Sequence, residues 1–260
     1  MRLFIIRHAE SANNRLALDL TYEEYMAQRS PDPPLTERGQ RQAKLLAEHL
    51  ASDTIPETYH ETIPTRQDGQ EPPARYGGYH ITHLYCSPML RTLQTAQPVV
   101  AALGLKPTVW VEIHEHGGMF KGNPRSGEEL IIHPGLTRAA IQADFPEYEL
   151  PETITEKGWW NSGYEDMPAC YARAIRVARD LRRRAQEERV AEVESHIAII
   201  SHGTFVDALI KALFNQLPER QIFYHHYNTG ISRIDFMPNG SLFLRYLNRV
   251  QHLPPEMISE

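Results

Sequence analysis

The sequence predicts an α/β fold with a mainly parallel central sheet, helices on both faces of the sheet, a lid-like insertion and a C-terminal hairpin. Short apolar runs of strand length alternate along the chain with amphipathic stretches of helical period, which is the order typical of a parallel sheet. The length of 260 residues is enough for one large core. We therefore expect a single domain over residues 1–260.

The N-terminal part contains the first predicted strand and the first predicted helix. Residues 3–6 (LFII) form a continuous apolar run of strand length. Residues 36–50 are expected to form a helix with Thr36 as its N-cap, because their apolar side chains recur at helical spacing. Residues 52–80 are rich in Thr, Glu, Gln and Pro, which favours an irregular insertion on the surface.

The central part resumes the alternation of strands and helices. A strand is predicted at 81–86 (ITHLYC), and Ser87 and Pro88 suit the N-cap and the first position of the helix that follows. A further strand is predicted at 107–113 (PTVWVEI).

Residues 114–168 form the second predicted insertion. They hold many Gly, Pro and Trp residues and only short helical stretches such as 136–145. We expect this insertion to cover a site and to set its specificity. Its large apolar side chains would either line an apolar mouth or pack the insertion onto the core. These side chains are Met119, Phe120, Trp159, Trp160 and Tyr164.

The C-terminal part completes the predicted sheet. A long amphipathic helix is expected at 169–190, followed by a strand at 196–200 and a helix at 204–214. Residues 231–236 and 241–247 flank the turn PNG and predict a hairpin.

The composition excludes several classes of function. A net charge of −6 makes nucleic acid or an anionic membrane a poor partner. The two cysteines form no CxxC motif, so we expect two buried thiols. The N-terminal apolar run is too short for a signal peptide, and no run approaches the ~20 residues of a membrane helix. We therefore expect a soluble, cytoplasmic protein.

Three strand-to-helix junctions carry arginine and histidine. Arg7 and His8 follow the first strand, Arg91 lies in the first turn of the helix after Ser87, and His202 follows strand 196–200. Ligands of parallel sheets bind beyond the carboxyl ends of the strands, where helix N-termini favour anions. Arginine matches phosphate oxygens in a bidentate way, and histidine can carry a phosphoryl group.

Several sequence blocks resemble the histidine phosphatase superfamily, which is also called the phosphoglycerate mutase-like family. The blocks are RHAES with Asn14 downstream, PLTERGQRQA, CSPMLRTLQTA, ISHGTFVDAL and the closing NTGISRIDF…LNRVQHL. They follow the family's order, and the first four span residues 3–214. Ala9 departs from the family's usual glycine, a change that we expect to be tolerated unless φ is positive there.

The resemblance implies a role for each matching residue. His8 would be the nucleophile that becomes phosphohistidine, while Arg7, Arg91 and His202 would bind the phosphoryl oxygens. Phosphate- or substrate-binding positions would be Ser11, Asn14, Gly203 and Thr204. The resemblance also implies that the reaction needs no metal and no organic cofactor, and that the partner is a small phosphorylated metabolite or another phosphomonoester.

The proton donor has two candidates in VEIHEHGGMFKG. Glu112 continues the alternation of the predicted strand, whereas Glu115 lies just beyond it and just before Gly117 and Gly118. The family places a carboxyl group after the third strand and before a glycine-containing turn, which favours Glu115 as the general acid.

The function predicted from the resemblance is hydrolysis of phosphate monoesters. Mutases of the family have a tyrosine and an arginine pair after the acid, and no such pair occurs between 117 and 168. The alternatives are mutase-type phosphoryl transfer, a non-catalytic phospho-ligand-binding protein on the same fold, and a metallohydrolase. HEH at 114–116 and HH at 225–226 supply imidazoles for the last of these but lack the HExxH spacing.

Overall fold

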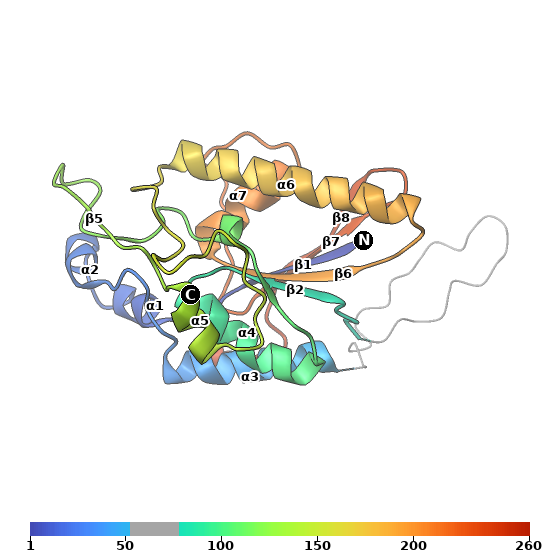
Figure 1. The fold of residues 1–260 in the computed structure, drawn as a ribbon, viewed down its shortest axis with the longest axis horizontal. Helices are drawn as coiled ribbons and strands as arrows, with labels where there is room; N and C mark the ends of the chain where they lie inside the picture. The colour runs from blue at the N-terminus through green and yellow to red at the C-terminus, as the bar shows by residue number, and fades with distance from the viewer. Residues whose placement is uncertain (53–77) are drawn as a thin grey trace.

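The computed structural model describes residues 1–52 and 78–260 and is built on one six-stranded sheet (Figure 1). The surface insertion predicted at 52–80 therefore falls almost wholly outside the described residues. The strands are β1 (Arg2–Arg7), β2 (His83–Cys86), β3 (Thr108–Val109), β6 (His196–Ser201), β7 (Ile231–Phe236) and β8 (Leu242–Arg249).

The strand order confirms the predicted sheet. The order is β3-β2-β6-β1-β7-β8, in which neighbours from β3 to β1 are parallel and β7 and β8 are antiparallel. Parallel neighbours end at the same edge of a sheet. The residues that follow β1, β2 and β6 are therefore brought together there.

Two pairs of helices cover the two faces of the sheet. Figure 1 shows α6 (Met167–Val190) and α7 (Gly203–Leu213) on one face, and α3 (Glu37–Ala51) and α4 (Leu90–Leu103) on the other. The side chains of β1 alternate accordingly: Leu3 and Ile5 pack with α6 and α7, and Phe4 and Ile6 pack with α3 and α4. This two-sided burial explains why LFII is apolar at every position.

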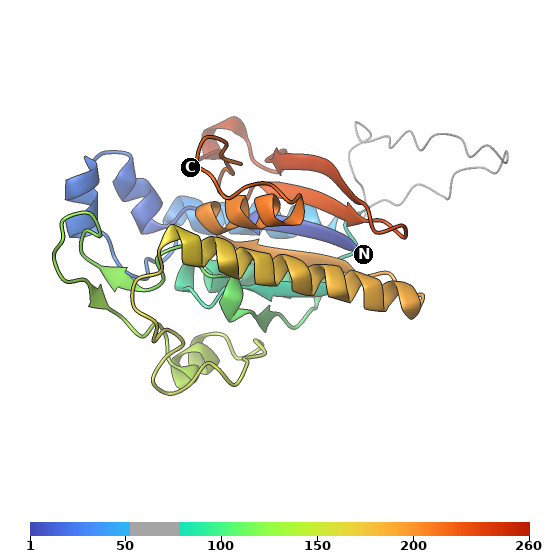
Figure 2. The same cartoon turned by 90° about the horizontal axis from the view of Figure 1, so that it is seen from above.

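Smaller elements lie beyond the carboxyl ends of the parallel strands. Figures 1 and 2 show α1, α2 and the β4–β5 hairpin at that end of the molecule. Their bounds are α1 (Ala12–Ala17), α2 (Tyr22–Gln28), β4 (Phe120–Lys121) and β5 (Ile131–Ile132). Two further short elements are α5 (Arg138–Asp144) and a 3₁₀ turn, η3 (Pro255–Met257). The Arg29 guanidinium lies 4.4 Å from the ring centre of Phe120, and that of Arg125 lies 4.4 Å from the ring centre of Tyr22. The β4–β5 hairpin and the loop that joins its strands therefore contact α2 and the residue that follows it.

The helices α1 and α2 were not predicted, although their N-terminal signals stand in the sequence. Ser11 and Asn14 cap each other at the start of α1, and Thr21 and Glu24 do the same for α2. Reciprocal caps of this kind satisfy backbone N–H groups that a helix leaves free.

The predicted strand 107–113 is wrong beyond its first half. Only Thr108–Val109 is a strand, and Val111–Ile113 forms a single 3₁₀ turn, η2. The alternating pattern of VWVEI imitates a strand, but Trp110 donates its N–H to Cys86 as the last contact with β2. The carbonyls of Glu112, Ile113 and His114 then accept from side chains of other elements, so they need no strand partner.

The predicted N-cap of α4 is also wrong. The helix begins at Leu90, and Ser87 makes no cap bond to its first turn. Instead the N–H of Leu90 donates to Oδ1 of Asp32 at 2.9 Å. A carboxylate from a distant loop thus caps α4, and the Ser87 hydroxyl bonds to His202 instead.

Three of the large side chains of the 114–168 insertion, Met119, Trp159 and Trp160, pack into the hydrophobic core. Met119, Phe120, Trp159 and Trp160 are all less than 9% exposed, and only Tyr164 is half-buried. Both cysteines are free and buried, as predicted. Among residues 1–52 and 78–260, no helix is both long and apolar enough to cross a membrane.

Candidate active site

The predicted arginines and histidines meet where β1 and β6 end. Arg7 is the parallel partner of Ser201, and the N–H of His8 donates to the Ser201 carbonyl at 2.8 Å. The His8 and His202 ring centres are 5.2 Å apart. Arg91 joins them from the first turn of α4. We refer to Arg7, His8, Arg91 and His202 as the Arg–His cluster.

The backbone fixes the tautomer of His8. Its Nδ1 lies 2.7 Å from the carbonyl oxygen of Ala9, which can only accept, so Nδ1 carries the proton. The lone pair of Nε2 then faces Arg91, whose Nε donates to it at 3.2 Å. Burial, and secondarily Arg91 and Arg7, hold the pKa of His8 well below its usual value. His8 is therefore a neutral imidazole with its Nε2 lone pair exposed to the cluster.

Ala9 fits this turn despite replacing the family's usual glycine. Its φ is not positive, its N–H donates to Thr95 Oγ1 at 3.0 Å, and its side chain is fully buried. The condition for accommodating alanine here, a φ that is not positive, is therefore met.

Arg91 contacts Nε2 of His8, and Arg7 adds a second guanidinium group to the Arg–His cluster. Arg7 donates to the carbonyl of His226, while its Nε is buried and has no partner within the described residues. Gly203 lies against it, since a Cβ there would be 3.5 Å from Nε of Arg7. Burial lowers the pKa of both arginines, and the nearby charge of Glu115 opposes that effect. Two clustered cations with unused donors suit a ligand that carries anionic oxygens.

His202 also has a donor without a partner. Its Nε2 lies 2.8 Å from the Ser87 hydroxyl, which accepts the N–H of Met89 at 3.3 Å and so can donate its own proton to Nε2. Nδ1 would then carry the proton of His202, and this buried atom has no partner in the described part of the chain. Burial is the main cause that holds the pKa of His202 well below its usual value.

The carboxylate of Glu115 lies at the N-terminus of α7. Oε1 accepts from the N–H groups of His116 at 2.8 Å and Phe205 at 3.0 Å, and Oε2 accepts from that of Thr204 at 3.3 Å. Free N–H groups at a helix start favour a negative charge. Glu115 therefore reaches the end of β6, beside the Arg–His cluster.

Glu112 points elsewhere. Its side chain is 37% exposed and pairs with Arg176 of α6 at 3.0 Å. Of the two candidate proton donors, only Glu115 lies near the Arg–His cluster.

The remaining predicted residues line the same region in different ways. Gly203 and Thr204 open α7, and Ser11 opens α1. Ser11 is buried and is engaged with Asn14, whose Oδ1 accepts from Ser11 N–H at 3.0 Å and Oγ at 2.9 Å. The Asn14 amide NH₂ forms no hydrogen bond within the described residues, so it is available to a ligand.

Two further residues that sequence analysis missed support the cluster. Asn228 is fully buried and donates from Nδ2 to the His8 carbonyl at 3.0 Å. Asp32 caps α4 and lies 3.9 Å from Nη1 of Arg91. Burial raises the pKa of Asp32 to about 6. Asn228 stands in the closing block NTGISRIDF and could have been noted there, whereas no local pattern marks Asp32 as a cap for a helix far along the chain.

Two of the four histidines considered as metal ligands, His114 and His226, make hydrogen bonds within the protein. Nε2 of both His114 and His116 is buried without a hydrogen-bond partner in the described residues. His114 donates from Nδ1 to the Val111 carbonyl, and its ring lies 4.8 Å from that of Trp160. His226 bonds through Nδ1 to the Tyr224 carbonyl and through Nε2 to Ser232. Within residues 1–52 and 78–260, no three His, Cys, Asp or Glu side chains gather as a metal site would require.

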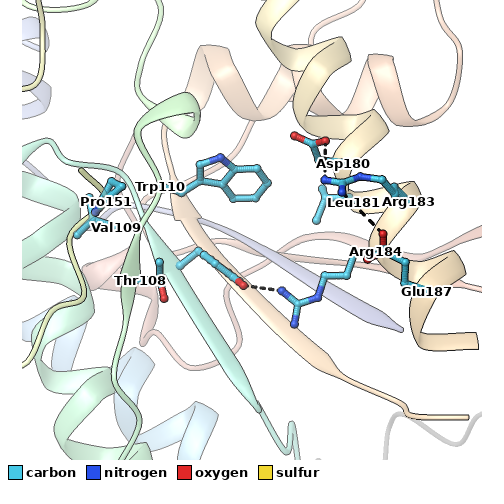
Figure 3. Close-up of a pocket in the computed structure, with 10 residues that line it drawn as sticks. Thr108, Val109, Trp110, Pro151, Asp180, Leu181, Arg183, Arg184 and Glu187 are labelled. Carbon is cyan, nitrogen blue, oxygen red and sulfur yellow. Dashed lines mark hydrogen bonds and ion pairs between the residues drawn. The ribbon is translucent and has the colours of Figure 1, made fainter. Parts of the chain in front are cut away.

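A separate pocket of about 540 Å³ lies between β3 and α6 (Figure 3). Its charged side chains are paired, because Arg183 contacts Asp180 and Glu187, and Arg184 donates to Tyr85. No predicted site residue lines this pocket, so the candidate active site is at the Arg–His cluster.

Comparison with protein families agrees with the sequence blocks. A model described as histidine phosphatase superfamily (branch 1) matches residues 3–61 and 66–249. Comparison with curated protein sequences gives no significant match.

Solved structures show the same fold. A phosphoserine phosphatase from Entamoeba histolytica, in complex with 3-phosphoglyceric acid, is 19% identical with a TM-score of 0.52, covering 97% of this chain and 99% of that one. A mycobacterial glucosyl-3-phosphoglycerate phosphatase in complex with VO3 is 19% identical with a TM-score of 0.53, covering 96% and 99%. The alpha-ribazole phosphatase of Shigella flexneri is 20% identical with a TM-score of 0.55, covering 96% of both chains. At these identities the likeness concerns the fold.

Proposed function

We propose that this chain, which belongs to the histidine phosphatase superfamily, hydrolyses phosphate monoesters of small metabolites through a phosphohistidine on His8. The observation that carries the proposal is the state of His8. Its Nδ1 proton is held by a carbonyl, and its Nε2 lone pair faces the guanidinium of Arg91. A nucleophile with its other nitrogen fixed as a donor is what phosphoryl transfer to histidine requires.

In the first step, Nε2 of His8 forms a bond to phosphorus as the ester P–O bond breaks. The electron pair of that bond goes to the leaving oxygen, which takes a proton from Glu115. Arg7, Arg91 and Nδ1 of His202 bind the three other oxygens, on which negative charge is spread. The unpartnered donors on Arg7 and His202 support this role, because an oxyanion would satisfy them.

In the second step, Glu115 takes a proton from water while the water oxygen bonds to phosphorus. The P–N bond breaks, its electron pair returns to Nε2, and inorganic phosphate is released. Gly203 and the amide of Asn14 would contact the phosphoryl group, Ser11 would orient Asn14, and Thr204 would contact the remainder of the substrate. The lid role of residues 114–168 belongs to the same proposal.

The segment after Glu115 supports transfer of the phosphoryl group to water rather than back to a phosphoglycerate, as in a mutase. Gly117 and Gly118 have φ values of +90° and +71°, and a Cβ on Gly118 would meet the Trp160 ring at 2.2 Å. These two positions hold glycine where the mutases of the family carry gripping side chains. Water should then reach the phosphohistidine.

Phosphate release from several alkyl and aryl monoesters, measured without bisphosphoglycerate primer and with excess chelator, tests the proposal. We expect turnover of several esters under these conditions. Incubation with 3-phosphoglycerate and primer is the matched assay for mutase activity. Faster formation of 2-phosphoglycerate than of phosphate from any ester would favour the mutase, and no turnover at all would favour a binding protein.

A further inference from the structure

Three consecutive backbone carbonyls just before Glu115 are bound by side chains from other elements. Nη1 of Arg173, on α6, donates to the carbonyls of Glu112 at 2.7 Å and His114 at 2.9 Å. The hydroxyl of Ser201, at the end of β6, donates to the carbonyl of Ile113 at 2.7 Å. The backbone that leads to Glu115 is therefore fixed from two sides, although it belongs to no strand.

Arg173 is itself held rigidly. It is 3% exposed, and Nε and Nη2 donate to the two oxygens of Glu165 at 2.8 and 2.6 Å. Nη2 also lies 3.7 Å from the sulfur of Cys170. With the two carbonyls on Nη1, all five guanidinium donors have partners, a set that lysine cannot reproduce.

Arg173 and Glu165 together hold the backbone on both sides of Glu115. The N–H of Glu165 donates to the Gly117 carbonyl at 3.2 Å, so the Arg173–Glu165 pair holds the backbone before and after Glu115. The Arg173 guanidinium also lies 4.4 Å from the ring centre of Phe205, whose N–H binds the Glu115 carboxylate at 3.0 Å. The loop and the helix that hold this carboxylate therefore share one buried support.

We infer that Arg173 and Ser201 are positioning residues for the general acid–base Glu115, an inference that rests on the proposed function. Neither residue needs to touch the substrate. Each fixes carbonyls within three residues of Glu115, and a carboxylate held in place transfers protons more effectively than one on a free loop. Loss of either contact should act on the steps that need Glu115.

The first test compares leaving groups in Arg173→Lys and Ser201→Ala. We expect kcat/KM for an alkyl monoester to fall about 10-fold or more, while kcat/KM for p-nitrophenyl phosphate falls less than about 3-fold, because a phenolate leaves without a proton. Arg176→Lys is the matched control, since Arg176 lies on the same helix and, among residues 1–52 and 78–260, pairs with the side chain of Glu112 alone. We expect it to leave both values unchanged.

The second test separates positioning from folding. In a Glu115→Gln background, Ser201→Ala should have no further effect on the alkyl ester, because the group that it positions is already disabled. This double-mutant comparison uses only Ser201→Ala and Glu115→Gln, so it tests the inference even if Arg173→Lys fails to fold. An equal loss on both esters, or full additivity with Glu115→Gln, would overturn the inference while wild-type hydrolysis stands. A wild-type chain that hydrolyses neither ester would overturn the proposed function and this inference together.

Discussion

The Arg–His cluster and the segment around Glu115 face the same ligand site but are built differently. Arg7 is the last residue of β1, His8 and His202 directly follow β1 and β6, and Arg91 lies in the first turn of α4, so the sheet and its helices set their positions. Glu115 stands on irregular backbone that is held by side chains from α6 and β6. The cluster presents donors to an anion, and the loop presents one carboxylate. In the proposed mechanism, elements of regular structure would bind the phosphoryl group, and a loop held by remote side chains would transfer the proton.

The largest expected effect that separates the two regions is that of Glu115→Gln. Removing a general acid–base group typically costs ~10²–10⁴-fold in rate, so alkyl esters should slow by that amount. Aryl esters should slow much less in kcat/KM, because the Arg–His cluster remains intact. Steady-state kinetics on both ester types measure the difference.

Glu112→Gln is the control for that experiment, since Glu112 is solvent-facing and paired with Arg176. It should change neither rate by more than about twofold. A stronger loss in Glu112→Gln than in Glu115→Gln would transfer the proton role to Glu112 and remove the functional division between the two regions.

Asp32→Asn has a smaller effect and tests the support of the Arg–His cluster. Burial raises the pKa of Asp32 to about 6, so between about pH 4 and 6 the folded chain holds a proton that the unfolded chain has lost. Ionisation of this carboxylate therefore makes the free energy of unfolding fall as pH rises through that window. The contribution is about 3 kcal/mol at most. Asparagine keeps the acceptor for Leu90 and cannot ionise.

Chemical unfolding of wild type and Asp32→Asn at several pH values measures this contribution. We expect the wild type to lose stability relative to the variant from pH 4 to pH 6, and the difference to become constant above about pH 7. Parallel stability curves, or a wild type that gains on the variant as pH rises, would show that Asp32 is ionised without cost in the folded chain.

Sequence patterns predicted the sheet and the Arg–His cluster because both depend on residues that are adjacent in the sequence. LFII and the IAII of 197–200 are apolar at successive positions, since both faces of β1 and β6 are covered. A strand end followed by Arg-His or His-Gly then places these side chains at one edge. Thr36 was correctly predicted as the N-cap of α3, since its Oγ accepts from Gly39 three residues on.

Contacts between distant segments account for what the sequence did not predict. Asp32 caps α4 across 58 residues of chain, and Ser87, which looked like that cap, instead reaches His202. Arg173 stands three residues after Cys170 and four before Val177, so its spacing places it at the apolar face of α6. Its partners, the carbonyls of Glu112 and His114, belong to a distant segment that no local pattern connects to it. The 3₁₀ turn at 111–113 depends on such contacts as well, since the carbonyls of Glu112 and Ile113 accept from remote side chains rather than from a strand.

Rapid-quench trapping of the phosphoenzyme tests the central claim most directly. With a ³²P-labelled aryl monoester, the account predicts acid-labile, base-stable label on His8 in the wild type and in His83→Ala, an exposed control histidine. Glu115→Gln should also form the label and should lose it slowly, because the water step lacks its base, whereas His8→Ala should form none. Label on another residue, label in His8→Ala, or turnover of the wild type with no trapped label would contradict the account.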